Sequence, residues 1–151
     1  MSQKYTLIIK NGNCFIDGKL TIADIGVVDN KIEKIGKLHQ EKSGQIIDAT
    51  KKIVLPGIID TQVHFREPGS TDAEDLESGS KAAVLGGVTS LFEMPNTNPP
   101  TANLIEFDKK LKAAKNRMHC NYAFYFGATP SNTDQLSKLK NVEGCCGVKL
   151  F

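Results

Sequence analysis

Short runs of alternating apolar and polar residues, separated by turn dipeptides, occupy the chain up to about residue 55. Alternation with a period of two is typical of half-buried strands, and dipeptides such as Asp-Gly favour tight turns. The runs cover residues 5–10, 14–16, 24–28 and 31–35, with further candidates at 45–47 and 53–55, and the turns are Asn11-Gly12, Asp17-Gly18 and Asp29-Asn30. We therefore predict that residues 1–55 form a small antiparallel β-sheet.

After Pro56 the pattern changes to apolar runs that alternate with segments of helical spacing. Strands are predicted at residues 57–65, 88–94, 121–126 and 147–151. A capping box, Thr71-x-x-Glu74, precedes the first helical segment, and Gly86-Gly87 follows it. A second helix is predicted from near Asn103, and a third after the weaker capping signal Ser131-x-x-Asp134.

Strands that alternate with helices indicate an α/β fold with a parallel sheet and helical crossovers. The pattern alone leaves two architectures open, an open doubly wound sheet and a closed barrel. An eightfold barrel takes roughly 250 residues, whereas residues 56–151 supply about half of one. If the fold is a barrel, we expect this segment to be a truncated barrel that ends on strand four.

Composition narrows the class of protein. With 40% hydrophobic and 24% charged residues, the chain suits an ordinary globular protein rather than a disordered one. The net charge is only +2 and the basic residues are scattered, so no nucleic-acid partner is indicated. No signal segment or long apolar run suggests a membrane, and a cytoplasmic location is expected. The four cysteines include one adjacent pair and no CxxC, which favours reduced thiols.

The densest polar stretch follows the first strand of the second segment, at residues 60–69. On a regular strand Asp60, Gln62, His64 and Arg66 would all point to one side, at the strand end where barrel enzymes carry catalytic groups. A purely structural role is the alternative, with His64 hydrogen-bonded and Arg66 paired to a neighbouring carboxylate. The residues alone leave both interpretations open.

The motif Pro-Gly-Ile-Ile-Asp-Thr-Gln-Val-His-Phe-Arg-Glu-Pro-Gly, followed by Gly-Gly-Val-Thr and then Glu-Met-Pro-Asn-Thr, resembles the cyclic amidohydrolases, and dihydroorotase most closely. The resemblance extends to residues 147–151. It implies a metal-dependent (β/α)8 barrel with a companion β-sandwich, of which residues 1–55 would be one part. It also implies zinc as cofactor and the reversible hydrolysis of dihydroorotate to N-carbamoyl-aspartate in pyrimidine biosynthesis.

The resemblance assigns roles to five residues. His64 matches the second histidine of a His-x-His metal-binding pair, and Gln62 replaces the first, where an amide oxygen is a poorer zinc ligand than imidazole. Arg66 and Asn96 match the pair that holds the substrate carboxylate. Lys149 matches a strand-four lysine that bridges two metals when carboxylated.

Other ligands of the family have no counterpart in this sequence. Two histidines of strands five and six, and the aspartate of strand eight that acts as general base, would lie beyond Phe151. The chain's two other histidines, His39 and His119, match no ligand position. We therefore expect no catalytic residue within this chain, and no turnover by the chain alone.

Three hypotheses follow for function. The chain is the N-terminal part of a dihydroorotase, which is the favoured interpretation; or a non-catalytic module that binds a partner; or part of a hydantoinase- or allantoinase-type cyclic amidase. The expected partners are a small-molecule substrate for the complete enzyme, and either a complementing C-terminal half or a second copy of the chain.

Overall fold

The computed structural model describes residues 5–38 and 42–151. The chain divides into two compact units, Met1–Pro56 and Gly57–Phe151. His39 lies outside the described residues. None of the described helices is both long and apolar enough to cross a membrane.

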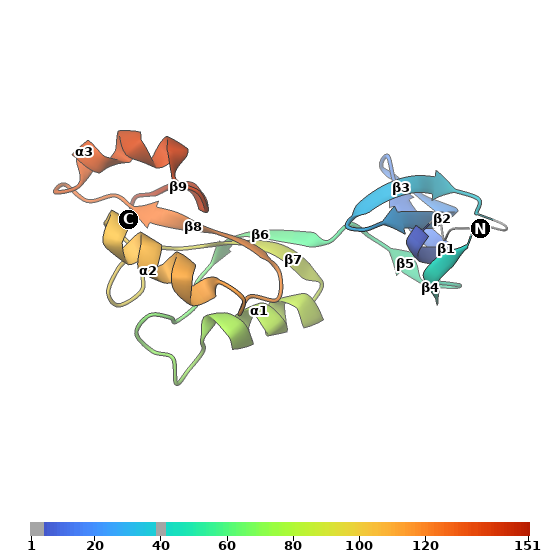
Figure 1. Ribbon diagram of the computed structural model, residues 1–151, viewed down its shortest axis with the longest axis horizontal. Coiled ribbons are helices and arrows are strands. Elements are labelled where there is room, and N and C mark those ends of the chain that lie inside the picture. Colours follow the sequence, from blue (N-terminus) through green and yellow to red (C-terminus); the bar gives the residue numbers. More distant parts are fainter. Residues whose placement is uncertain (1–4, 39–41) are drawn as a thin grey trace. The chain divides into compact units, whose positions relative to one another are not determined.

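The first unit is a five-stranded sheet (Figure 1). Its strands are β1 (Tyr5–Ile16), β2 (Lys19–Val28), β3 (Lys31–Gly36), β4 (Ser43–Asp48) and β5 (Ile53–Val54). The order is β3-β2-β1-β4, and β5 also pairs with β1. The hairpins β1–β2 and β2–β3 are antiparallel as expected, but β4 and β5 run parallel to β1, so the sheet is mixed.

One predicted turn in this unit is a bulge instead. Asn11-Gly12 lies inside the continuous strand β1, where the pairing with β2 shifts between Ile9 and Gly12. Asn11 has φ 60°, and the same left-handed geometry that suits a turn also accommodates the extra residue of a bulge. Asp24 supports it, because its Oδ1 accepts a hydrogen bond from the Asn11 amide at 2.8 Å.

The second unit is a parallel four-stranded sheet with helical crossovers (Figure 1). The strands β6 (Ile58–Val63), β7 (Val88–Glu93), β8 (Asn121–Gly127) and β9 (Cys145–Lys149) are adjacent in chain order. The connections contain α1 (Leu76–Leu85), α2 (Leu104–Ala114), the short α3 (Thr133–Leu136) and the 3-10 helix η1 (Ser137–Asn141). The predicted alternation of strand and helix is confirmed.

The caps of the helices differ in part from the prediction. The helix α2 begins next to Asn103 as expected, and Asn103 caps it, with its Oδ1 accepting from the Glu106 amide at 2.9 Å. The capping box of α1 is formed by Asp75 and Ser78, not by Thr71 and Glu74. The predicted box was wrong because residues 70–74 form turns of their own before the helix begins.

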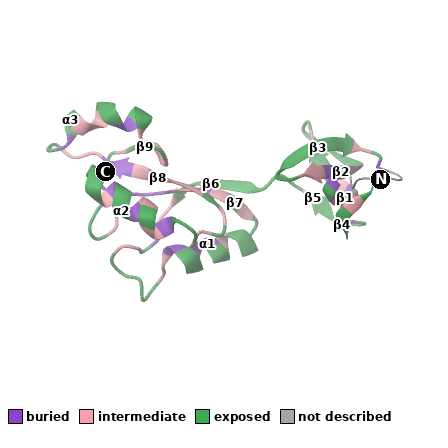
Figure 2. Ribbon diagram, in the orientation of Figure 1, coloured by how far each residue is buried: buried purple, intermediate pink, exposed green. Residues whose placement is uncertain are grey.

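The core of the second unit lies between the sheet and the helices α1 and α2, which Figure 2 shows as buried positions on their facing sides. Its buried members include Phe65, Leu76, Leu91, Phe107, Phe124 and Phe126. The rings of Phe107 and Phe124 meet edge to face, with centroids 6.4 Å apart. Because Leu91 and Phe124 face the helices, their neighbours Phe92 and Tyr125 pair on the opposite face of the sheet.

Candidate functional site

The candidate site lies where β6 and β7 end. In a parallel sheet the carboxyl ends of the strands meet at one edge, so the residues that follow them come together. His64 and Arg66 follow β6, and Asn96 follows β7. The hydrogen bond from the Met94 amide to the Val63 carbonyl, 2.8 Å long, joins the two strand ends.

His64 is oriented by Asn96. The imidazole Nδ1 lies 2.8 Å from Asn96 Oδ1. An amide oxygen can only accept a hydrogen bond, so in the neutral ring Nδ1 carries the proton and Nε2 keeps its lone pair. The Asn96 amide nitrogen remains as a donor. The contact therefore prepares one acceptor or ligand atom, His64 Nε2, and one donor, Asn96 Nδ2.

Arg66 and Asn96 line a shared hollow of about 130 Å³. Its other lining residues are Phe65, Pro68, Gly69, Ser70, Thr97 and Asn98. The two loops that form it are joined by the hydrogen bond from the Asn98 amide to the Pro68 carbonyl, 3.0 Å long. A guanidinium and an amide nitrogen in one hollow form a set of donors that suits a small anionic group such as a carboxylate.

The packing of Phe65 determines the direction of its two neighbours, His64 and Arg66. Phe65 is buried in the core against α1, where a Cβ on Gly79 would come within 2.6 Å of its ring. Consecutive side chains of an extended segment point to opposite sides. His64 and Arg66 are thereby directed away from the α1 face of the sheet.

The predicted row of four polar side chains does not form. The pairing of β6 with β7 is irregular between Asp60 and Val63, so regular alternation is interrupted there. Asp60 turns toward its own strand and accepts a hydrogen bond from the Gln62 amide at 3.0 Å. The side chain of Gln62 is exposed. The single-sided arrangement was wrong because a bulge changes the direction of side chains on either side of it.

Glu67, next to Arg66, is bound elsewhere. Its carboxylate makes two contacts with Arg117, Oε1 to Nη1 at 2.8 Å and Oε2 to Nη2 at 3.0 Å. Burial acts to raise the pKa of Glu67, but hydrogen bonds from Arg117 and the Leu76 amide, with the charge of Arg117, lower it overall. Glu67 is therefore an ionised structural anchor rather than the partner of Arg66.

Lys149 lies at the end of β9, two strands away from β7. Its carbonyl accepts a hydrogen bond from the Ala128 amide at 2.8 Å, and its ammonium lies 5.3 Å from the centre of the Phe151 ring. In the described part of the chain no contact joins Lys149 to His64 or Gln62. Its role as a bridging ligand stays a prediction.

The described residues do not complete a metal centre. Within residues 5–38 and 42–151 there is no group of three or more His, Cys, Asp or Glu side chains that could hold a metal ion. His64 Nε2 is a suitable single donor, and its bond to Asn96 is the kind that orients a ligand imidazole. A tetrahedral zinc site needs further ligands besides this one imidazole.

Two buried contacts close to this edge were not singled out from the sequence. Asn132, only 3% exposed, donates to the carbonyls of Ala102 and Gly127 and accepts from the Thr129 amide. Glu93, the last residue of β7, meets Lys110 of α2 at 2.7 Å in an ion pair that solvent does not reach. An Asn before a helix is a common cap, and a Lys on a helix is normally exposed, so neither residue type signalled its position.

Barrel enzymes carry their active sites on polar groups at the carboxyl ends of parallel strands, which is the arrangement found here. The model of the Amidohydrolase family matches residues 53–145, and the chain belongs to that family. It is 38% identical over 148 residues to allantoinases from Desulfitobacterium hafniense and Rubrobacter xylanophilus, 97% of this chain in each case. Among solved structures, L-hydantoinase from Arthrobacter aurescens shares 32% identity with a TM-score of 0.88 over 96% of this chain.

The chain spans about a third of the length of these relatives, 33% and 32% of the two allantoinases and 32% of the hydantoinase. The predicted fold, a small β-sheet portion followed by the first strands and helices of a barrel, is confirmed by the hydantoinase structure. The predicted amidohydrolase family is also confirmed. The preference for dihydroorotase is not confirmed, because the relatives named here are allantoinases and a hydantoinase.

Proposed function

We propose that this chain forms the N-terminal portion of a cyclic amidase that opens a ring amide of the allantoin or hydantoin type. The supporting observation is the similarity to allantoinases over 97% of the chain. In such a hydrolysis water adds to the ring carbonyl and the carbon–nitrogen bond of the ring breaks. The carbonyl carbon becomes a carboxylate, and the nitrogen takes up a proton as part of a ureido group on the same open-chain product. The role of this chain is to bind and orient the substrate.

The hollow beside β6 and β7 supplies the binding groups. Arg66 and Asn96 Nδ2 donate to an oxygen-rich part of the substrate, and His64 Nε2 faces the reacting end as an acceptor or ligand atom. The groups that would activate water are not among these residues. We therefore propose that activity requires a C-terminal portion, present in the relatives, that supplies them.

Dihydroorotase is the second candidate activity. Its substrate carries a free carboxylate beside the ring amide, and the pairing of a guanidinium with an amide donor in one hollow suits that group. Allantoin and hydantoin carry no such carboxylate. The choice between the two activities therefore depends on whether Arg66 contributes to substrate affinity.

A chimaera tests both activities. This chain is fused to the part of the Desulfitobacterium allantoinase that follows the matched third, and ring opening of allantoin, hydantoin and dihydroorotate is measured after metal loading. We expect turnover of allantoin or hydantoin, loss of activity in His64→Ala, and no turnover by the 151-residue chain alone. Hydrolysis of dihydroorotate alone, with a large rise in KM in Arg66→Ala, would select the second candidate. A folded, metal-loaded chimaera inactive on all three would refute the proposal.

A further inference from the structure

Contacts of the Glu67 carboxylate hold the loop that carries Arg66 in place. One carboxylate oxygen of Glu67 accepts a hydrogen bond from the Leu76 amide at 2.9 Å, at the start of α1. Both oxygens contact the guanidinium of Arg117. Paired contacts of this kind fix orientation as well as distance, because the planar guanidinium matches the carboxylate.

Arg117 reaches this loop from a distant part of the chain. It lies just beyond α2, 50 residues from Glu67, and its Nη1 also donates to the Ala113 carbonyl at 3.1 Å. Asp75 and Glu77, at the start of α1, lie 3.6 and 3.9 Å from the same guanidinium. One cation beyond the end of α2 therefore faces three carboxylates, one in the loop that follows β6 and two at the start of α1.

The opposite side of this loop borders the hollow. The Pro68 carbonyl accepts from the Asn98 amide, and the Arg66 carbonyl accepts from the Ser70 amide at 2.9 Å. Gly69, with φ 125°, packs so closely on Asn98 that a Cβ would lie 3.1 Å from its carbonyl oxygen. A movement of Glu67 would be passed through Pro68 and Gly69 to the loop that holds Asn96.

We propose that Arg117 is a positioning residue for the hollow, acting through Glu67 to hold the Arg66 loop against the Asn96 loop. The proposal rests on the function proposed above for Arg66 and Asn96. Arg117 itself does not line the hollow. If Arg117 served only to anchor α2 to α1, its loss would loosen the whole unit evenly rather than this loop first.

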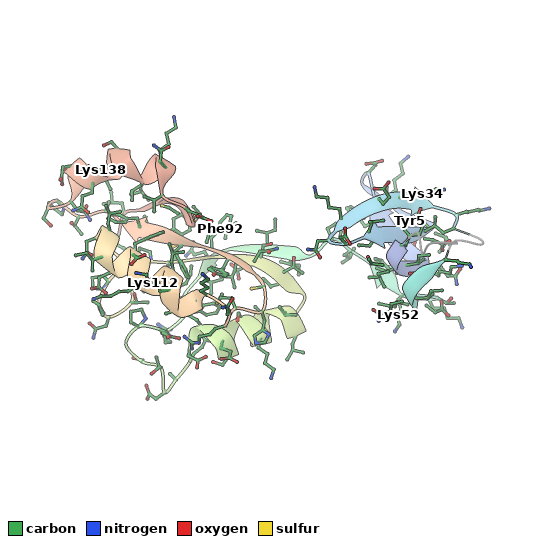
Figure 3. The ribbon with its side chains drawn as sticks, in the orientation of Figure 1. Tyr5, Lys34, Lys52, Phe92, Lys112 and Lys138 are labelled. Carbon is green, nitrogen blue, oxygen red and sulfur yellow. The ribbon has the colours of Figure 1, made fainter. Side chains whose placement is uncertain are left out.

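Hydrogen exchange followed by mass spectrometry on the full chain separates these roles. The variants are Arg117→Ala, Arg117→Lys and the control Lys112→Ala, which removes an equal charge from α2 at an exposed ion pair with Asp108 (Lys112 is labelled in Figure 3). We expect Arg117→Ala to speed exchange at least 10-fold in peptides covering residues 66–75 and 96–101, but not in one covering 121–127. Arg117→Lys should restore part of the protection against exchange. Lys112→Ala should exchange at the rate of the wild type in all three peptides. Unchanged loop exchange, or equal acceleration in all peptides, would overturn the proposal.

Binding of a carboxylate probe provides the second measurement. Succinate is titrated against the wild-type chain and observed by saturation-transfer NMR, with Arg66→Ala as the variant that removes the binding group. We expect Arg117→Ala to weaken succinate binding at least fivefold. Equal affinity in Arg117→Ala and wild type would overturn the positioning role. If the wild type binds no succinate, the carboxylate function of the hollow fails, while the exchange result still decides whether Arg117 holds the loop.

Discussion

At the scale of single residues, Gly79 shows how a missing side chain shapes the site. It lies on α1 directly over the ring of Phe65, and a Cβ there would come within 2.6 and 2.7 Å of two ring carbons. Phe65 is the buried residue between His64 and Arg66. The absence of a side chain at Gly79 therefore permits the packing that directs both polar neighbours toward the other side.

Gly79→Ala is expected to destabilise the chain by about 1–3 kcal/mol, because overpacking the core outweighs the gain of up to about 1 kcal/mol in helix propensity. Urea unfolding measures the change. Gly86→Ala is the matched control, since a Cβ at Gly86 meets nothing closer than 3.4 Å. A Gly79→Ala chain as stable as the control would show that Phe65 can move without cost.

Asn132 joins the loops that follow β7 and β8. Its side chain makes hydrogen bonds of 2.7, 2.9 and 2.8 Å to Ala102, Gly127 and Thr129. We expect Asn132→Ala to cost about 2–4 kcal/mol of unfolding free energy, because buried backbone groups lose their partners. Asn132→Asp should also destabilise, since a carboxylate cannot donate to two carbonyls. The exposed Asn141→Ala serves as control, and a loss as small as that of the control would contradict the assigned role.

Residue patterns predicted more of the backbone than of the contacts between side chains. The motif placed His64, Arg66 and Asn96 at one sheet edge, because strand ends follow from the alternation of strand and helix. The hydrogen bond between His64 and Asn96 spans 32 residues and depends on the path of two loops, which no local pattern specifies. The contact of Glu67 with Arg117 spans 50 residues, and it was missed because no local pattern specifies such a distant pair.

At the scale of elements, prediction from short sequence patterns failed where the same local backbone geometry occurs in two different structures. Asn11-Gly12 suits both a turn and a bulge, and only the pairing of β1 with β2 on both sides decides between them. Parallel pairing of β4 with β1 was equally unpredictable, because strand alternation does not encode direction. The cap of α1 moved to Asp75 because the preceding residues form turns stabilised by backbone hydrogen bonds.

The ion pair between Glu93 and Lys110 joins β7 to α2 inside the core. Their side chains are 0% and 1% exposed, and the contact of 2.7 Å does not have the angles of a hydrogen bond. Burial raises the pKa of Glu93 to about 7, although the charge of Lys110 opposes this. Burial lowers the pKa of Lys110, although Glu93 opposes that shift in turn. Burial therefore favours the neutral form of both groups, and the charge of each group opposes this shift in the other.

The raised pKa of Glu93 predicts a loss of stability as pH increases. The folded chain holds this proton up to about pH 7, whereas the unfolded chain releases it near 4.5. The stabilising contribution is thus complete below about pH 4.5 and is lost as pH rises through 7, by up to about 3 kcal/mol. The pKa values of Glu67 and Asp75 are lowered, so these two groups change the stability only in more acidic solution. Urea unfolding between pH 5 and 8 measures the decline.

Two variants provide the controls for this ion pair. Lys110→Met leaves a buried carboxyl without its partner and should cost about 3–5 kcal/mol at pH 8. The double variant Glu93→Leu/Lys110→Met should recover most of that loss and remove the decline between pH 5 and 8. A double variant that keeps the same decline would assign the titration to other groups.

At the scale of the whole molecule, apolar side chains remain on the surface of both units. In the first unit Phe15, Leu20, Ile22 and Ile53 share one face of the sheet, because Phe15 pairs with Leu20 and Asn13 pairs with both isoleucines. Ile22 and Ile53 are 71% and 62% exposed.

In the second unit β6 and β9 are edge strands, and Ile58 and Ile59 of β6 are exposed.

These surfaces predict that the purified chain associates with itself, since an unpaired parallel strand and an uncovered apolar face both offer contacts to another copy. Sedimentation velocity over micromolar concentrations should show a concentration-dependent increase in mass. Ile22→Lys/Ile53→Glu, which places charges on the first unit's apolar face, should reduce association if that face is responsible. If only β9 and β6 are responsible, the double variant will associate like the wild type. A monomer that unfolds cooperatively across this range would contradict the prediction, and would show that the exposed edges are too short or too twisted to pair.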